Sequence, residues 1–154
     1  MTVSVRPGEP NGAASSFLSG MFREPLAGHA CTVPVPADTR VALASTDKTL
    51  QGLVCALTTP TAQWGAPTAV NLPALTTTVG DMANALKEVA GDSVAALLDW
   101  QVDANVQAIV SGWPSQFDND RAKSLGLVAD TSVKSLIQSY ALRHPQAITC
   151  ALTF

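Results

Sequence analysis

The sequence has little charge. Of its 154 residues, 14% are charged, and 9 Lys and Arg stand against 12 Asp and Glu, which gives a net charge of −3. Proteins that bind nucleic acid through their charge carry a basic surface, so this composition argues against such a partner. The hydrophobic fraction of 47% is too high for a disordered chain, and the length is that of one domain.

Long apolar runs and metal-binding motifs are also missing. No apolar run approaches the ~18 residues of a membrane span, and the first residues lack the apolar core of a signal peptide. The three cysteines have no short spacing and the two histidines lie far apart from each other, so no metal or redox motif is visible. We therefore expect a soluble cytoplasmic protein with no metal and no membrane contact.

Strand and helix patterns alternate along the chain and predict an α/β (or α+β) fold. A β-branched run predicts a strand over 2–6, and 40–44 and 68–72 are further strand candidates. The segment 31–35 contains Pro34 and is at best a short edge strand, and the second half of the ambiguous segment 94–102 favours another strand. Apolar residues at helical spacing predict helices over 13–26, 47–57, 79–90, 103–113 and 131–144, with a short one over 118–125. This order predicts a few mostly parallel strands and about five helices.

Two of these helices have clear sequence signals. The helix over 79–90 begins at Thr78, which together with Asp81 resembles a capping box, and Gly91 is a natural stop. The apolar residues of the helix over 47–57 fall on one face; they are Leu50, Leu53, Val54 and Leu57.

The domain prediction is one unit over 1–145 followed by a tail over 146–154. Apolar residues alternate along this tail, which suits a strand added at a sheet edge.

Several motifs occur in an order and spacing that resemble one enzyme family. They are V-R-P-G-E-P-N at 5–11, G-M-F-R-E-P-L at 20–26, V-N-L-P at 70–73 and S-G-W-P at 111–114. Together they resemble the C-terminal half of extended short-chain dehydrogenase/reductases, in the NAD-dependent epimerase/dehydratase group and nearest to the D-erythronate dehydrogenase type. The resemblance covers roughly residues 2–143 and implies the substrate-binding part of that fold.

The family's N-terminal half has no counterpart in this sequence. It supplies the glycine-rich turn that holds the pyrophosphate of NAD or NADP, and no G-x-G-x-x-G motif is present here. The family's catalytic Tyr is followed four residues later by Lys, whereas the single tyrosine, Tyr140, is followed by His144. Tyr140 lies on the apolar face of its helix and is predicted to be a core residue. The chain alone is therefore expected to hold no cofactor.

The resemblance also implies site residues. Those implied for substrate binding are Glu9, Asn11, Ser15, Ser16, Arg23 and Arg40. Pro7 and Gly8 match a segment that lies against the nicotinamide, which applies only if the missing half is supplied. Glu9 stands where the subgroup often has a basic residue, and this counts against an acidic substrate.

Each of these residues also has an alternative explanation, in which its role is structural. Asn11 suits a turn, and Ser15 and Ser16 suit a helix start. Arg23 is then an ion-pair partner of Glu24 or a solvated side chain. For Arg40 the alternative is a strand-edge residue beside an aspartate.

Three functions remain open from the sequence. The first is a truncated short-chain dehydrogenase-like protein that carries the substrate-binding part only, without independent NAD-dependent redox activity. The second is a cofactor-free isomerase, cyclase or lyase for a small oxygenated substrate, with acid, base or anion-stabilising groups among Glu9, Asn11, Ser15, Arg23 and His29. The third is a non-catalytic binding or assembly module.

The expected strand over 2–6 leads to a prediction about binding partners. With the N-terminal half missing, one edge of this strand is predicted to be unpaired, and such edges recruit other chains. We expect a small-molecule ligand and either a homo-oligomer or a complementing N-terminal half.

Overall fold

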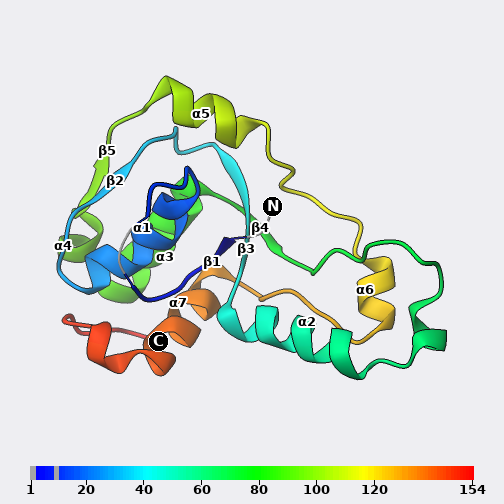
Figure 1. The fold of residues 1–154 in the computed structure, drawn as a ribbon. Helices are drawn as coiled ribbons and strands as arrows, with labels where there is room; N and C mark the ends of the chain where they lie inside the picture. Colours follow the sequence, from blue (N-terminus) through cyan, green and yellow to red (C-terminus); the bar gives the residue numbers. More distant parts are fainter. Residues whose placement is uncertain (1–2, 9–10) are drawn as a thin grey trace.

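A computed structural model describes residues 3–8 and 11–154, and over these residues it has five short strands and seven α helices (Figure 1). The strands are β1 (Val3–Ser4), β2 (Cys31–Val33), β3 (Arg40–Ala44), β4 (Leu75–Thr78) and β5 (Leu98–Trp100). The helices are α1 (Ser16–Leu26), α2 (Thr46–Thr58), α3 (Val79–Ala90), α4 (Asp92–Ala95), α5 (Ala104–Ser111), α6 (Asp120–Ser124) and α7 (Val133–Arg143). Two 3-10 turns, η1 (Thr61–Trp64) and η2 (Pro145–Ala147), complete the structure, and the α/β class is confirmed.

The strands form two small sheets. One has the order β1-β3-β4, with β1 parallel and β4 antiparallel to β3, and the other pairs β2 with β5 in parallel. The register places Val3 opposite Leu43 in the first pair and Arg40 opposite Thr78 in the antiparallel pair. The expectation of mostly parallel strands therefore holds for two of the three pairs among the described residues.

The predicted strand over 68–72 is wrong, because the strand at this point of the chain is β4. The carbonyl of Thr68 accepts a hydrogen bond from the Arg121 guanidinium at 3.1 Å, and Pro73 follows this segment. The segment Leu75–Thr78 pairs with β3 instead, and Thr78 then caps α3 by accepting the backbone N–H of Asp81 at 3.0 Å.

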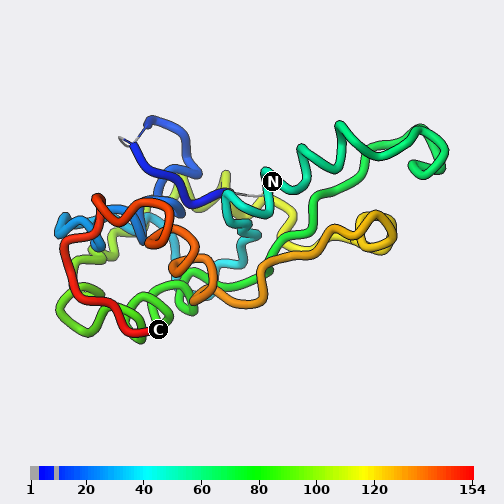
Figure 2. The backbone as a smooth tube through the Cα atoms, turned by 90° about the horizontal axis from the view of Figure 1, so that it is seen from below, coloured from blue at the N-terminus to red at the C-terminus, as the bar shows by residue number. Residues whose placement is uncertain are grey.

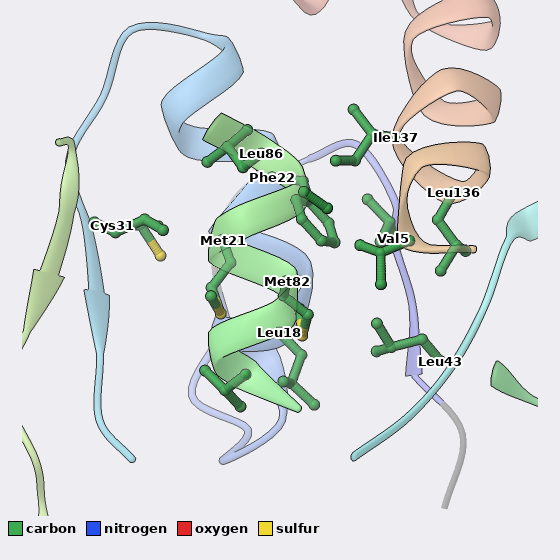
Figure 3. Close-up of a cluster of buried hydrophobic side chains, with 14 of the residues drawn as sticks. Val5, Leu18, Met21, Phe22, Cys31, Leu43, Met82, Leu86, Leu136 and Ile137 are labelled. Atoms are coloured by element: carbon green, nitrogen blue, oxygen red, sulfur yellow. The ribbon is translucent and has the colours of Figure 1, made fainter. Parts of the chain in front are cut away.

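The hydrophobic core lies between α1, α3 and α7 on one side of the three-stranded sheet (Figure 3). Phe22 of α1 and Leu86 of α3 are fully buried, and Ile137 of α7 closes the cluster beside them. Val5, which follows β1, contributes a buried side chain from the sheet side. We call this part, made of α1, α3, α7 and the sheets, the body.

α2 and α6 extend to one side of the body (Figures 1 and 2). Ser45 caps α2 and accepts the backbone N–H of Lys48 at 3.2 Å. No residue of α2, all of which the structure describes, is buried. We call α2, the loop over 59–72 that follows it, and α6 the arm.

The tail over 146–154 forms no strand and lies against the body. The backbone N–H of Thr149 donates to the carbonyl of Leu26 at 2.9 Å, and that of Thr153 donates to the carbonyl of Val89 at 2.8 Å. The tail therefore covers the C-terminal ends of α1 and α3. In the described part of the chain, no helix combines the length and the apolar character that a membrane crossing requires.

Candidate functional site

A cavity of about 420 Å³ opens between the start of α1, β2 and α5. Its volume falls within the range of ligand pockets in proteins. Its polar side chains are Asn11, Ser16, Arg23, Glu24 and Thr32, plus the thiol of Cys31. The remaining walls are small or apolar and come from Gly12, Ala13, Ala14, Phe17, Gly20, Ala30, Pro34 and Val106.

The turn before α1 shapes one end of this cavity. The side-chain carbonyl of Asn11 accepts the backbone N–H of Ala13 at 3.1 Å, and the backbone N–H of Asn11 donates to Ser16 Oγ at 3.3 Å. The turn role weighed for Asn11 is thus confirmed. Ser16 Oγ acts as an acceptor in this bond, and its O–H donates to no acceptor among the described residues. Since Ser16 lines the cavity, this O–H can donate to a ligand there.

Arg23 and Glu24 form an ion pair in the wall of the cavity. Arg23 Nε and Nη2 lie 2.8 and 2.6 Å from Glu24 Oε1, and the arginine side chain is only 7% exposed. The ion-pair alternative weighed for Arg23 is therefore confirmed. A buried guanidinium held in this way is charge-balanced and has a fixed orientation.

A second cavity of about 270 Å³ lies on the other side of this ion pair. Pro7, Gly8, His29 and Tyr140 line it together with Arg23 and Glu24. The Arg23–Glu24 pair thus separates the two cavities. The structure brings Pro7 and Gly8 to Arg23, but it does not place them in the first cavity with Asn11 and Ser16.

Tyr140 is buried as predicted, with 3% of its surface exposed. Its hydroxyl has no hydrogen-bond partner among the described residues, and its ring centroid lies 5.2 Å from that of His144. Burial raises the pKa of the Tyr140 hydroxyl, Arg23 opposes the rise and Glu24 adds to it. The hydroxyl is therefore protonated at neutral pH and suited to hydrogen bonding rather than to proton abstraction.

Three of the expected substrate-binding residues are not placed in the first cavity. Ser15 precedes α1 and makes no side-chain capping bond, and it does not line the cavity. Arg40 is exposed at the start of β3, opposite Thr78, and lines neither cavity. Glu9 lies outside the described residues.

Gly20 and Cys31 are among the wall residues that sequence reasoning missed. Gly20 had a signal, since it lies four residues after Ser16 and three before Arg23, on the same helical face. A Cβ at Gly20 would lie 3.1 Å from Cys31 Sγ, so glycine at this position keeps α1 close to β2. Cys31 reaches the cavity through the return of the chain after α1, and no local pattern indicates this.

The arrangement favours binding over acid–base chemistry. Glu24, the carboxylate among the described wall residues, is already paired with Arg23. Burial raises the pKa of the Cys31 thiol to about 11, so the thiol is protonated at neutral pH and is a poor nucleophile. The described residues contain no cluster of three or more His, Cys, Asp or Glu side chains that could hold a metal.

The chain is similar in sequence to two D-erythronate dehydrogenases. It is 42% identical to that of Cupriavidus necator over 139 residues, which is 90% of this chain and 43% of the relative. It is 34% identical to that of Haemophilus influenzae, over 90% of this chain and 44% of the relative. No protein-family model matches the chain.

A solved structure supports the same relationship. The nucleoside-diphosphate-sugar epimerase from Agrobacterium tumefaciens superposes with a TM-score of 0.88 and 32% identity, over 93% of this chain and 42% of that chain. The chain is a partial member of the short-chain dehydrogenase and epimerase family. It spans less than half the length of the relatives named here, and the family resemblance seen in its motifs is confirmed.

A similar fold occurs in a solved structure of lower sequence identity. The L-threonine dehydrogenase from Cupriavidus necator superposes with a TM-score of 0.76 over 91% of this chain and 44% of that chain. At 18% identity this likeness shows the fold alone.

The described residues do not fit a whole dinucleotide. The cavity that Pro7 and Gly8 line holds about 270 Å³, which is below the usual range even for drug-sized ligands. The turn before α1 is not followed by a glycine triplet that would let the backbone approach a pyrophosphate. These residues could contact one end of a dinucleotide at most.

Proposed function

We propose that this chain carries the substrate-binding part of an epimerase-type dehydrogenase and binds a small polyhydroxy compound in the first cavity. By their names, the two sequence relatives act on D-erythronate, a four-carbon polyhydroxy acid, and we propose a ligand of this class here. The observation that carries the proposal is the set of polar groups around the start of α1. It combines a free hydroxyl donor, a buried ion pair and a cavity of suitable volume.

Each polar group has a distinct part in this binding. The Ser16 O–H donates to a ligand oxygen, and the first N–H groups of α1 favour oxygen acceptors in the same place. The Arg23 guanidinium offers its remaining N–H groups, and the Glu24 carboxylate can accept from ligand hydroxyls. Because the ion pair is neutral as a whole, hydroxyl groups contribute more to recognition than net ligand charge does.

We further propose that the chain has no redox activity of its own. A hydride transfer needs a held dinucleotide, and the second cavity is too small for one. Neither the protonated Cys31 nor the paired Glu24 supplies the base that a cofactor-free isomerase or lyase would need.

Titration calorimetry and ligand-observed NMR with D-erythronate, D-gluconate and NAD test this function. We expect a sugar acid to bind and NAD not to bind at micromolar concentration. Ser16→Ala should weaken sugar-acid binding by about 2- to 10-fold, as expected for loss of one hydrogen bond.

Ser111→Ala is the matched control, since the exposed Ser111 hydroxyl bonds only the carbonyl of Gln107 and lies outside the cavity. Equal affinities in both variants, or tight NAD binding by the wild-type chain, would contradict the proposal.

A further inference from the structure

Gly20 lies in the middle of the α1 wall of the first cavity. It follows Ser16 by four residues and precedes Arg23 by three, so these residues share one side of the helix. Cys31 points from β2 towards α1 (Figure 3), and its Sγ lies 3.1 Å from the place that a Cβ of Gly20 would occupy. On this side of α1, the wall between Ser16 and Arg23 therefore has no side chain.

The Arg23–Glu24 ion pair lies beside the same place. A Cβ at Gly20 would lie 4.0 Å from Arg23 Nη2 and 3.9 Å from Glu24 Cγ. Helical side chains tilt towards the N-terminus of their helix, and this tilt brings the Arg23 guanidinium back over the turn that contains Gly20. A methyl group at Gly20 would thus cover one side of the guanidinium, and glycine leaves that side open to the cavity.

We propose that Gly20 determines the specificity of the first cavity, because it leaves Arg23 accessible to a ligand that Ser16 also holds. The inference rests on the proposed function, since it concerns the ligand of the same cavity. It adds the residue that sets the preferred ligand length.

The geometry of α1 gives this length. Ser16 and Gly20 are four residues apart, which corresponds to ~6 Å along the helix axis. A ligand that bonds both Ser16 and the guanidinium beside Gly20 must place two oxygens about this far apart. The oxygens of an extended four-carbon polyhydroxy acid can do so, whereas the two-carbon hydroxy acid glycolate reaches only one of the two groups. Because bonds from a charged donor are the stronger ones, loss of the Arg23 contact should weaken binding markedly.

Ligand-observed NMR titrations with glycolate and D-erythronate test this inference. The wild-type chain should bind D-erythronate about 10-fold or more tightly than glycolate. In Gly20→Ala this preference should fall to about 2-fold or less, mainly through weaker binding of D-erythronate, because the methyl group covers the guanidinium and leaves Ser16 untouched.

Two other glycines provide controls. Gly112→Ala lies outside the cavity at the end of α5, where the backbone has helical dihedrals and a Cβ would make an ordinary contact, so both affinities should stay unchanged. Gly12→Ala adds a methyl group to the cavity wall near Ser16, where a Cβ would meet no described atom within 4 Å. It should change both affinities by the same factor, because both ligands use the Ser16 end.

A double variant separates a covered guanidinium from a displaced strand. Gly20→Ala with Cys31→Ala removes the sulfur that would press on the new methyl group, so α1 and β2 can keep their spacing. The preference for D-erythronate should stay lost in this variant, because the methyl group still covers Arg23.

Three results would overturn the inference: a preference that Gly20→Ala leaves intact, an equal loss of preference in Gly12→Ala, or recovery of the preference in the double variant. Equal binding of glycolate and D-erythronate by the wild-type chain would also overturn it, yet leave the proposed function in place. If neither compound binds the wild-type chain, the proposed function itself fails, and the inference fails with it.

Discussion

The body and the arm carry the same sequence pattern with opposite outcomes. In α3 of the body, Val79, Met82 and Leu86 recur at helical spacing and are fully buried. In α2 of the arm, aliphatic residues recur at the same spacing, Leu50 and Leu53 among them, and are about half exposed or more. Helical periodicity therefore predicts that an apolar face exists, but not that the same chain covers it.

The two regions should differ most in the stability that they lose when a leucine is truncated to alanine. Leu86→Ala should reduce the free energy of unfolding by about 2–5 kcal/mol, because it leaves a cavity between α1 and α3. Leu57→Ala, at a side chain that is 87% exposed, should change it by less than about 0.5 kcal/mol. Urea unfolding followed by circular dichroism measures both. A loss above about 1 kcal/mol for Leu57→Ala would show that the arm is covered in the isolated protein.

Local signals explain which elements could be predicted. β3 over Arg40–Ala44 and α3 over Val79–Ala90 match the prediction, because a short apolar run and a capped amphipathic helix are encoded by neighbouring residues. The segment 68–72, expected to be a strand, instead makes a non-local contact. Arg121, more than fifty residues later, binds the carbonyl of Thr68, and no local pattern reveals this bond.

The candidate site was predictable to a similar degree. Asn11, Ser16 and Arg23 meet in one cavity because they lie on one turn and one helix, so their spacing carries the geometry. Arg40 was assigned only through the family resemblance, and the structure places it at an exposed strand start outside both cavities. The position of Cys31 in the cavity wall depends on how β2 packs along α1. This is a tertiary contact, and the local sequence does not encode it.

A smaller effect should appear in the pH dependence of the body. The pKa of Cys31 is about 11 in the folded chain and near 9.0 when exposed, so the unfolded chain releases this proton first. The stability contributed by the protonated thiol is fully present below pH 9 and is lost as the pH rises towards 11. Urea unfolding between pH 8 and 11 should show this decline.

Variants separate the groups that cause this decline. Burial also raises the pKa of Tyr140 and of Cys150, so Cys31→Ala should flatten the decline without abolishing it. Tyr140→Phe provides the comparison, because it removes the buried phenol hydroxyl, whose pKa is also raised, while the ring is kept. An unchanged slope in Cys31→Ala would show that the thiol is already ionised or exposed in the folded protein.

A small effect on global stability is expected at Arg121, whose side chain holds the arm loop. Its guanidinium donates to the carbonyls of Trp64 and Thr68 at 3.0 and 3.1 Å and also to that of Ala66. Arg121→Met keeps the aliphatic stem but removes every donor, and the exposed carbonyls can then turn to water. The free energy of unfolding should therefore fall by less than about 1 kcal/mol.

Hydrogen exchange should nevertheless change sharply and locally in Arg121→Met. Amides over 64–70 should exchange about 10-fold faster, whereas those of α1 and α3 should keep their protection, because local opening and global unfolding are separate events. Lys123→Met is the control, since the Lys123 ammonium contacts only the carboxylate of Asp120, at 3.2 Å. Faster exchange throughout the body would instead make arm and body one cooperative unit, and the exposed apolar side chains of α2 would then contribute to the stability of the core.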